Sequence, residues 1–227
     1  METQIPAVDE APSTDVSPKP PSEYVVELVQ KARLSTGRLA SLPTTLKNQA
    51  LIAMADGLVA NAEDILAANE KDLDAFGSTK DKQAMADRLR LTPERIQAMA
   101  DGIREIARLS DPVGQTLNMR RRPNGMQVGR VRVPIGVIGI IYESRPNVTA
   151  DSAALCLKSG NACVLRGGSE AIHSNTTIAA VLSDAAGKAG APSGSISLTG
   201  QSSSRYCPHV LYQRRSDGTR DHSMTPR

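Results

Sequence analysis

Four consecutive residues, Arg166, Gly167, Gly168 and Ser169, have the composition of an anion-binding loop. They follow the apolar run Ala162–Leu165 directly, and a segment of helical periodicity comes next. Small residues and a cation at the carboxyl end of a strand, facing a helix start, suit an anion such as a nucleotide phosphate. The alternative is a tight strand-to-helix turn whose glycines only satisfy backbone geometry, since a lone Gly-Gly pair without GxGxxG is a weak signal.

Three polar residues, Glu143, Arg145 and Asn147, lie just beyond a second apolar run, Val137–Tyr142. Open α/β sheets bind ligands at this end of their strands. An arginine there could hold a substrate carboxylate or phosphate, and an asparagine amide could donate to a developing oxyanion. The alternative is structural: a proline shapes the loop and Asn147 caps a helix that begins at Val148.

The three cysteines do not form a recognisable reactive or metal site. Cys156 lies in a segment of helical periodicity and Cys163 inside an apolar run, where cysteine packs as a small hydrophobe. Cys207 and His209 lie close in sequence, but their segment has no periodicity that would hold a geometry. The spacings contain no CxxC, so they fit neither a disulfide framework nor a zinc site, and a reducing compartment is expected.

The elements that must position these residues form one βαβ unit within Val131–Ser169. Neither apolar run alternates polar with apolar residues, which is typical of strands covered on both faces. The segment between them, Val148–Ser159, is long enough for a crossover helix, and Gly160-Asn161 is a stop signal. Strand, helix and strand in this order predict a right-handed unit of a parallel sheet.

Composition limits the class of protein. The chain has 227 residues, 40% of them hydrophobic but only 2% aromatic, so aliphatic side chains must fill its core. The net charge of +3 lies entirely in residues 201–227 and is too small to indicate nucleic-acid binding. No secretory signal and no apolar run near the ~20 residues of a membrane span are present, which predicts a soluble cytoplasmic protein without a membrane partner.

The chain divides into four expected parts. Residues 1–22 contain many prolines and few large apolar residues, which predicts a disordered leader. Residues 23–112 carry helical periodicity, and residues 113–199 are expected to form a partial βαβαβ domain. Residues 200–227 have no period of either kind and predict a disordered tail, with an out-of-frame origin as an alternative.

Outside the βαβ unit, periodicity and boundary residues predict several elements. The clearest helix start is Thr92-Pro93-Glu94, which combines an N-cap hydroxyl, a proline in the first turn and an acid. The basic run Arg120-Arg121-Arg122 is expected in a solvated loop or near a subunit contact. The remaining elements are helices over 23–42, 45–68 and 172–188, a short helix within 69–82, and strands over 126–133 and 195–198.

Two motifs go beyond a generic βαβ unit: Tyr142-Glu143-x-Arg145-Pro146-Asn147-Val148-Thr149 and Leu165-Arg166-Gly167-Gly168. Upstream, Asp87-Arg88-Leu89-x-Leu91-Thr92 and Asp111-Pro112-Val113-Gly114 extend the match. With these motifs the chain resembles the gamma-glutamyl phosphate reductase (glutamate-5-semialdehyde dehydrogenase) family of the aldehyde dehydrogenase superfamily. The resemblance runs from about Glu23 to Ser197, roughly the first half of a complete family member.

The resemblance implies an α/β, aldehyde-dehydrogenase-like fold, in which a helical N-terminal region precedes a partial Rossmann-like parallel sheet. It implies NADPH-dependent reduction of L-glutamyl 5-phosphate to L-glutamate 5-semialdehyde in proline biosynthesis, by an oligomeric enzyme. Arg166, Gly167, Gly168 and Ser169 fall where the superfamily contacts the adenosine ribose and its phosphate, so NADP is the implied cofactor. The segment from Glu143 through Arg145 to Asn147 falls at the substrate.

The same resemblance indicates what the sequence lacks. The reaction needs a thiolate, because a thioester accepts hydride more readily than a carboxylate. In the family this cysteine stands in a Pro-Ser-x-Cys-Asn context, which does not occur in this sequence. The chain is therefore expected to be inactive alone and truncated near residue 198. Two alternatives remain: a non-catalytic fragment that binds nucleotide or a partner, and a chain that does not fold alone because its sheet exposes an edge.

Overall fold

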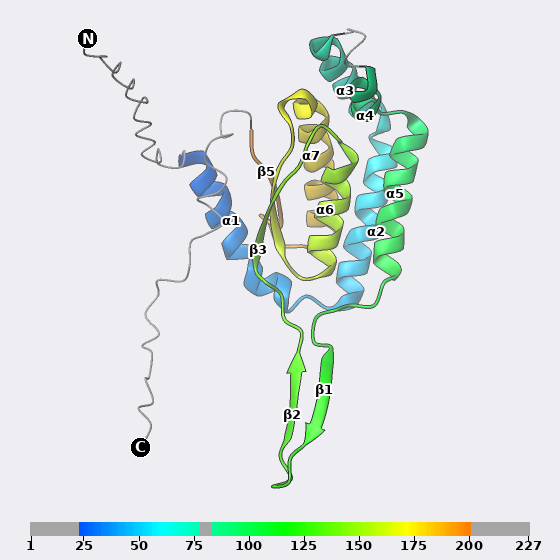
Figure 1. Ribbon diagram of the computed structural model, residues 1–227. Coiled ribbons are helices and arrows are strands. Elements are labelled where there is room, and N and C mark those ends of the chain that lie inside the picture. The colour runs from blue at the N-terminus through cyan, green and yellow to red at the C-terminus, as the bar shows by residue number, and fades with distance from the viewer. Residues whose placement is uncertain (1–22, 78–82, 201–227) are drawn as a thin grey trace, which may run out of the picture.

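The computed structural model describes residues 23–77 and 83–200 (Figure 1). The expected leader, residues 1–22, and residues 201–227 of the expected tail lie outside the described residues. Within them the elements are α1 (Glu23–Ala40), α2 (Thr44–Ala60), α3 (Ala62–Phe76), α4 (Gln83–Leu89), α5 (Pro93–Arg108), β1 (Thr116–Arg121), β2 (Gln127–Val131), β3 (Val137–Ile141), α6 (Asn147–Lys158), β4 (Ala162–Arg166), the 3-10 turn η2 (Ser169–Ala171), α7 (Ile172–Lys188) and β5 (Ile196–Leu198).

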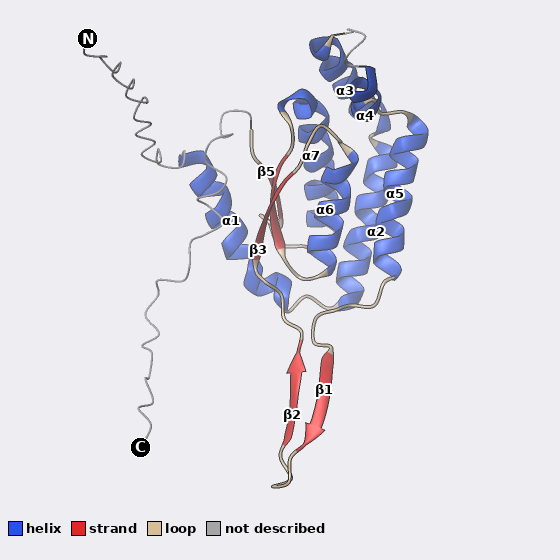
Figure 2. Cartoon of the chain, in the orientation of Figure 1, coloured by secondary structure: helices blue, strands red, loops and turns tan. Residues whose placement is uncertain are grey.

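A three-stranded parallel sheet, in the order β3-β4-β5, forms the centre of the molecule (Figure 2). Val137 pairs with Ala162, and Cys163 pairs with Ile196. The crossover helix α6 ends at Lys158, and Gly160, two residues beyond it, has a positive φ of 73°, a conformation that glycine adopts without strain. The predicted βαβ unit and the predicted third strand are confirmed.

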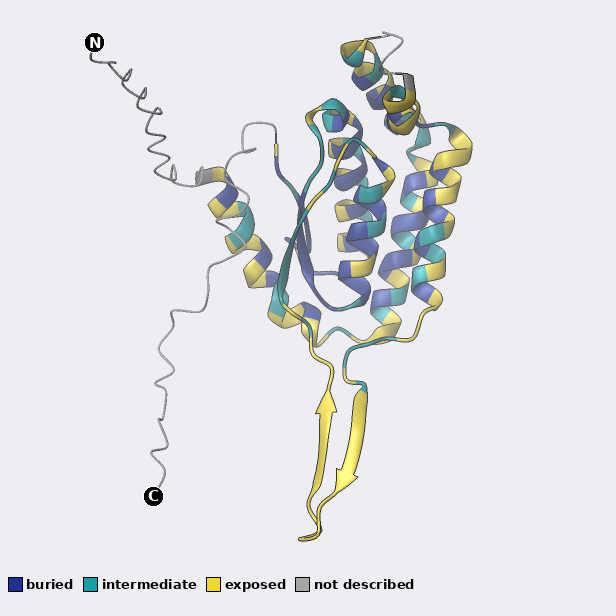
Figure 3. Cartoon of the chain, in the orientation of Figure 1, coloured by how far each residue is buried: buried dark blue, intermediate teal, exposed yellow. Residues whose placement is uncertain are grey.

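Helices cover both faces of this sheet. α1 lies against one face, while α6 and α7 lie against the other, with α2 and α5 packed behind them (Figure 1). The central strand β4 is buried along Ala162–Leu165, which explains why its sequence does not alternate (Figure 3). Aliphatic side chains fill the core as the composition requires. None of the described helices is long and apolar enough to cross a membrane.

The helical region differs from its prediction in two places. The single helix expected over 45–68 is two helices, because α2 stops at Asn61, whose Nδ2 donates to the Gly57 carbonyl at 2.7 Å. α3 then runs through the polar segment to Phe76, and α4 was not predicted. The predicted start of α5 is confirmed: the Arg95 amide donates to Thr92 Oγ1 at 3.2 Å, and Pro93 occupies the first turn.

The basic segment forms a β-hairpin and not a loop. β1 pairs antiparallel with β2, so Arg120 and Arg121 lie in a strand, and the predicted strand over 126–133 is shorter at both ends. The register shifts beside Asn118, which has a φ of 52°. All residues of both strands are exposed, and the hairpin projects away from the sheet and its helices (Figure 3).

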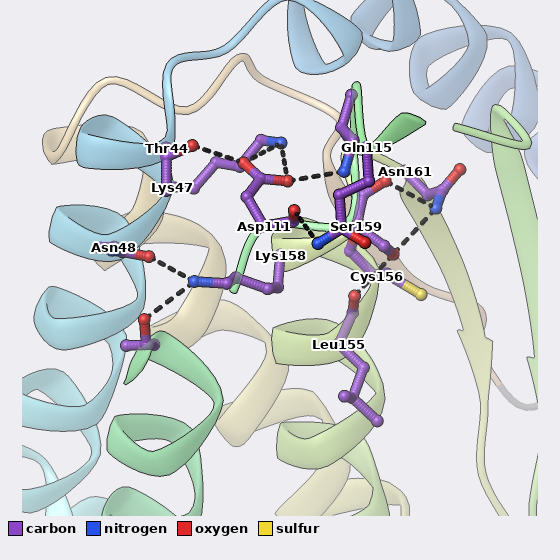
Figure 4. A network of polar contacts seen from close by, with 12 residues as sticks. Thr44, Lys47, Asn48, Asp111, Gln115, Leu155, Cys156, Lys158, Ser159 and Asn161 are labelled. Carbon is purple, nitrogen blue, oxygen red and sulfur yellow. Dashed lines mark hydrogen bonds and ion pairs between the residues drawn. The ribbon is translucent and has the colours of Figure 1, made fainter. Parts of the chain in front are cut away.

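A polar network holds the base of this hairpin against the helices (Figure 4). The Asp111 carboxylate accepts hydrogen bonds from Thr44 Oγ1 at 2.8 Å, from Lys47 Nζ at 2.9 Å and from the Val113 amide at 2.9 Å. Nearby, Lys158 Nζ donates to Asn48 Oδ1 at 2.6 Å and to the Ala107 carbonyl at 2.8 Å. Burial lowers the pKa of Lys158. The network joins α2, α5, α6 and the segment that leads into β1.

Candidate functional site

An open cleft of about 440 Å³ lies at the carboxyl ends of β3 and β4. Four of the predicted site residues line it, namely Glu143, Arg145, Arg166 and Gly168. The carboxyl ends of neighbouring parallel strands meet at one edge of a sheet, which is where ligands of open α/β folds bind. The structure therefore brings together residues that two separate segments of the sequence contribute.

Asn147 lies in a second cleft of about 380 Å³, which Arg145 also lines. It is the first residue of α6, whose N-cap is Pro146, and no side chain caps the helix. The alternative that Asn147 caps a helix beginning at Val148 is therefore wrong. Asn147 is exposed. Burial raises the pKa of the neighbouring Asp151, and a hydrogen bond from Asn147 opposes this effect.

The two glycines allow the loops after β3 and β4 to approach closely. A Cβ at Gly168 would lie 2.6 Å from Glu170 Oε2 and 2.8 Å from Ser144 Oγ, two atoms that hydrogen-bond each other at 2.9 Å. A Cβ at Gly167 would overlap the Asn175 amide nitrogen. Loop packing alone therefore disfavours a side chain at either position, most strongly at Gly167.

A series of hydrogen bonds between side chains behind the cleft holds these loops in place. The Tyr142 and Thr149 hydroxyls are 2.6 Å apart, and Thr149 donates to Asn175 Oδ1 at 2.9 Å. The Tyr142 amide also donates to the Arg166 carbonyl at 3.0 Å. Burial raises the pKa of Tyr142 to about 12, so the phenol stays protonated. The ends of both strands and the starts of α6 and α7 are thereby joined.

The cationic groups of the cleft have no carboxylate partner among the described residues. Arg145 is exposed and Arg166 is half-buried, and neither guanidinium forms an ion pair in residues 23–77 and 83–200. Ser169 is exposed at the start of η2, immediately beyond the glycines. Guanidinium and hydroxyl donors at a strand end suit a phosphate or a carboxylate.

The sequence interpretation missed several residues of the clefts, among them Arg88, Ser144 and Glu170. Ser144 and Glu170 line the first cleft, and Arg88, which comes from α4, lines both. The only sequence signal for Arg88 is its place in the motif Asp87-Arg88-Leu89-x-Leu91-Thr92. Neither periodicity nor composition places α4 beside the loop after β3.

The two cysteines of the described residues take no part in this site. Cys156 and Cys163 are buried free thiols within the core, which confirms their predicted packing role. Cys207 and His209 lie outside the described residues. In the described part of the chain, no group of three or more His, Cys, Asp or Glu residues could hold a metal ion.

Comparison with known proteins identifies this architecture. A profile of the aldehyde dehydrogenase family matches residues 3–209. Gamma-glutamyl phosphate reductase of Clostridium novyi is 51% identical over 175 residues, which are 77% of this chain and 42% of that protein. The enzyme of the same name from Caldanaerobacter subterraneus is 56% identical over 169 residues, 74% of this chain and 41% of the relative.

Solved structures give the same result. The crystal structure of gamma-glutamyl phosphate reductase from Thermotoga maritima superposes with a TM-score of 0.73 at 38% identity, over 77% of this chain and 42% of that one. The Saccharomyces cerevisiae structure of the same name has a TM-score of 0.69 at 31% identity, over 76% and 45%. The chain spans less than half the length of these relatives. The predicted aldehyde-dehydrogenase-like fold is confirmed, and the chain belongs to the aldehyde dehydrogenase family.

Proposed function

We propose that this chain supplies the cofactor-binding side of a cytoplasmic gamma-glutamyl phosphate reductase that functions as a homo-oligomer. That reaction converts L-glutamyl 5-phosphate, NADPH and a proton into L-glutamate 5-semialdehyde, NADP and phosphate. The names of its relatives and the Tyr142–Thr149 motif support this assignment. The observation that carries it is the cleft at the ends of β3 and β4, which Arg145 and Arg166 line without an ion pair to any described residue, as a site for phosphorylated ligands requires.

The residues of the cleft fit a nicotinamide dinucleotide phosphate. Arg166 would pair with the 2′-phosphate, and Ser169 would donate to the same group. The bound cofactor supplies a hydride. Arg145 would hold an acidic group of the substrate, and the Asn147 amide would stabilise negative charge on the acyl oxygen. The thiolate that must attack the acyl carbon has no counterpart in this sequence. We therefore expect that the chain alone does not reduce L-glutamyl 5-phosphate.

Two measurements on the purified chain test this proposal. NADPH fluorescence should titrate saturably on addition of the chain, whereas L-glutamyl 5-phosphate with NADPH should give no turnover. Robust turnover would contradict the missing-nucleophile argument. If the chain binds no NADPH but still associates with a full-length relative, the alternative of a non-catalytic, partner-associating fragment is favoured.

Replacing Arg166 by glutamine should weaken NADPH binding by about tenfold to a hundredfold, because a charge-assisted contact contributes roughly 1.5–3 kcal/mol. Affinity for NADH should change much less, since NADH lacks the 2′-phosphate. The measurement is a pair of fluorescence titrations, with Arg108→Gln as a control of equal charge on the exposed end of α5. Equal losses for both nucleotides would show that Arg166 does not select the phosphate.

A further inference from the structure

We infer that Arg88 on α4 acts with Arg145 as a two-arginine site for the phosphoryl group of the substrate. This inference rests on the proposed function and adds to it a residue from a different part of the chain. Arg88 and Arg145 are the two residues that line both clefts described above, so they stand where the clefts adjoin. Arg166 lines only the cleft at the ends of β3 and β4, and Asn147 lines only the other.

The backbone around Arg88 is held in place by its neighbours. Leu89 is fully buried, and its carbonyl accepts a hydrogen bond from Asn69 Nδ2 at 2.9 Å. The Leu91 amide donates to Asn69 Oδ1 at 2.8 Å. Arg88 itself is exposed, so its guanidinium projects from an anchored backbone into solvent at the clefts. A side chain presented in this way can contribute to a defined site, although it lies on a short helix.

The adjacent acid does not neutralise Arg88. Arg95 donates to the Asp87 carbonyl at 2.5 Å and to the Arg90 carbonyl at 2.6 Å, and its guanidinium pairs with the Asp87 carboxylate at 3.2 Å. Asp87 is therefore engaged by Arg95, which also ties the end of α4 to α5. In the described residues Arg88 has no ion pair of its own.

Two other carboxylates of the clefts have hydrogen-bond partners of their own, while Glu143 also lines the cleft at the ends of β3 and β4 and is exposed. Glu170 accepts a hydrogen bond from Ser144 at 2.9 Å, and Asp151 interacts with Asn147. Two guanidinium groups that border one cavity repel each other, and an anion between them offsets that repulsion. Their planar forks match phosphate and carboxylate oxygens, so an anion is the expected occupant.

The position of Asn147 selects the phosphoryl group over the substrate carboxylate. In the proposed function, Asn147 donates to the acyl oxygen of the acyl phosphate. The phosphate is bonded to that same acyl carbon, whereas the α-carboxylate is several bonds away. Arg88 and Arg145 share the cleft with Asn147, so they would contact the phosphoryl oxygens and stabilise the phosphate as it leaves.

The test is a calorimetric titration of the purified chain with inorganic phosphate and, separately, with L-glutamate. Arg88→Gln should weaken phosphate binding about tenfold, as expected for one charge-assisted contact. Arg88→Lys keeps the charge but loses the planar fork of donors, so its phosphate affinity should lie between those of the unmodified chain and Arg88→Gln. The control Arg108→Gln, which makes the same charge change outside both clefts, should bind phosphate as the unmodified chain does. Thermal unfolding of each variant verifies that it is folded.

Several outcomes would overturn the inference. One is that Arg88→Gln leaves the phosphate affinity unchanged, and another is that Arg108→Gln loses as much phosphate affinity as Arg88→Gln does. The other two outcomes are that Arg88→Gln weakens the binding of L-glutamate alone, and that the unmodified chain binds no phosphate. NADPH titration separates this failure from failure of the proposed function. An unmodified chain that binds NADPH but fails these phosphate tests contradicts only the inference, whereas a chain that binds no NADPH contradicts the proposed function itself.

Discussion

Replacing Asp111 by alanine is expected to lower the free energy of unfolding by about 3–5 kcal/mol, the usual cost of breaking a buried ion pair from one side. The Lys47 side chain is only 1% exposed and that of Asp111 11%, so the variant leaves an ammonium group buried without its counterion. Thr44 and the Val113 amide lose their acceptor as well. Urea unfolding followed by circular dichroism measures the change.

Two variants make this test specific. Asp101→Ala removes a carboxylate whose ion pair with Arg104 is exposed, so it should cost no more than about 1 kcal/mol. The double variant Lys47→Met with Asp111→Ala removes both charges and should recover much of the loss, since a buried pair replaced by apolar groups is often nearly neutral. A double variant as unstable as Asp111→Ala would show that the unpaired charge is not the cause.

The same carboxylate gives stability a defined pH dependence. Burial acts to raise the pKa of Asp111, but the hydrogen bonds from Lys47, the Val113 amide and Thr44 outweigh it and hold the pKa below the ordinary 3.8. A carboxyl whose pKa is lower in the folded state stabilises the protein above its ordinary pKa and loses that effect as the pH falls through the lowered value. The difference between the unmodified chain and Asp111→Ala should therefore shrink below pH 3.8.

Replacing Leu165 by alanine is expected to cost about 2–5 kcal/mol, because it opens a cavity in the central strand of the sheet. Leu165 is 0% exposed, and helices cover both faces of β4. Leu34→Ala on α1, where the leucine is 85% exposed, is the matched control and should change stability by less than about 0.5 kcal/mol.

This pair of variants also tests whether the chain folds alone. If the chain has a packed core, it should unfold in a cooperative thermal transition. Leu165→Ala should lower the midpoint temperature of that transition, and Leu34→Ala should leave it unchanged. If neither variant moves the transition, or if no cooperative transition exists, then the alternative in which the incomplete sheet prevents independent folding is supported.

The elements that could be predicted from the sequence are those whose apolar pattern is set by burial in the core. β3, β4 and α6 were predictable because strands covered on both faces need continuous apolar runs, and because a glycine, Gly160, follows the end of the helix between them. β1 was missed because none of its residues is buried, and its alternation is limited to Leu117 and Met119 before it ends in two arginines. The break at Asn61 was missed because the apolar spacing continues across it and asparagine is a weaker stop signal than glycine or proline.

The candidate site was predictable only where it is local. Arg145 and Arg166 could be placed because each follows a strand, and strand ends in a parallel sheet meet at one edge. Arg88 could not, because its place beside the cleft depends on how α3, α4 and α5 pack, and in particular on Asn69 and Arg95. No local pattern encodes such a distant contact.

The position of α1 has a consequence for the order of events at the ribosome. Its apolar residues Ala32 and Leu39 are buried against a sheet whose central strand is synthesised only after residue 161. At about 5–20 residues per second, roughly ten seconds separate the emergence of α1 from that of β4. The apolar side of α1 must therefore remain uncovered by the sheet during that time.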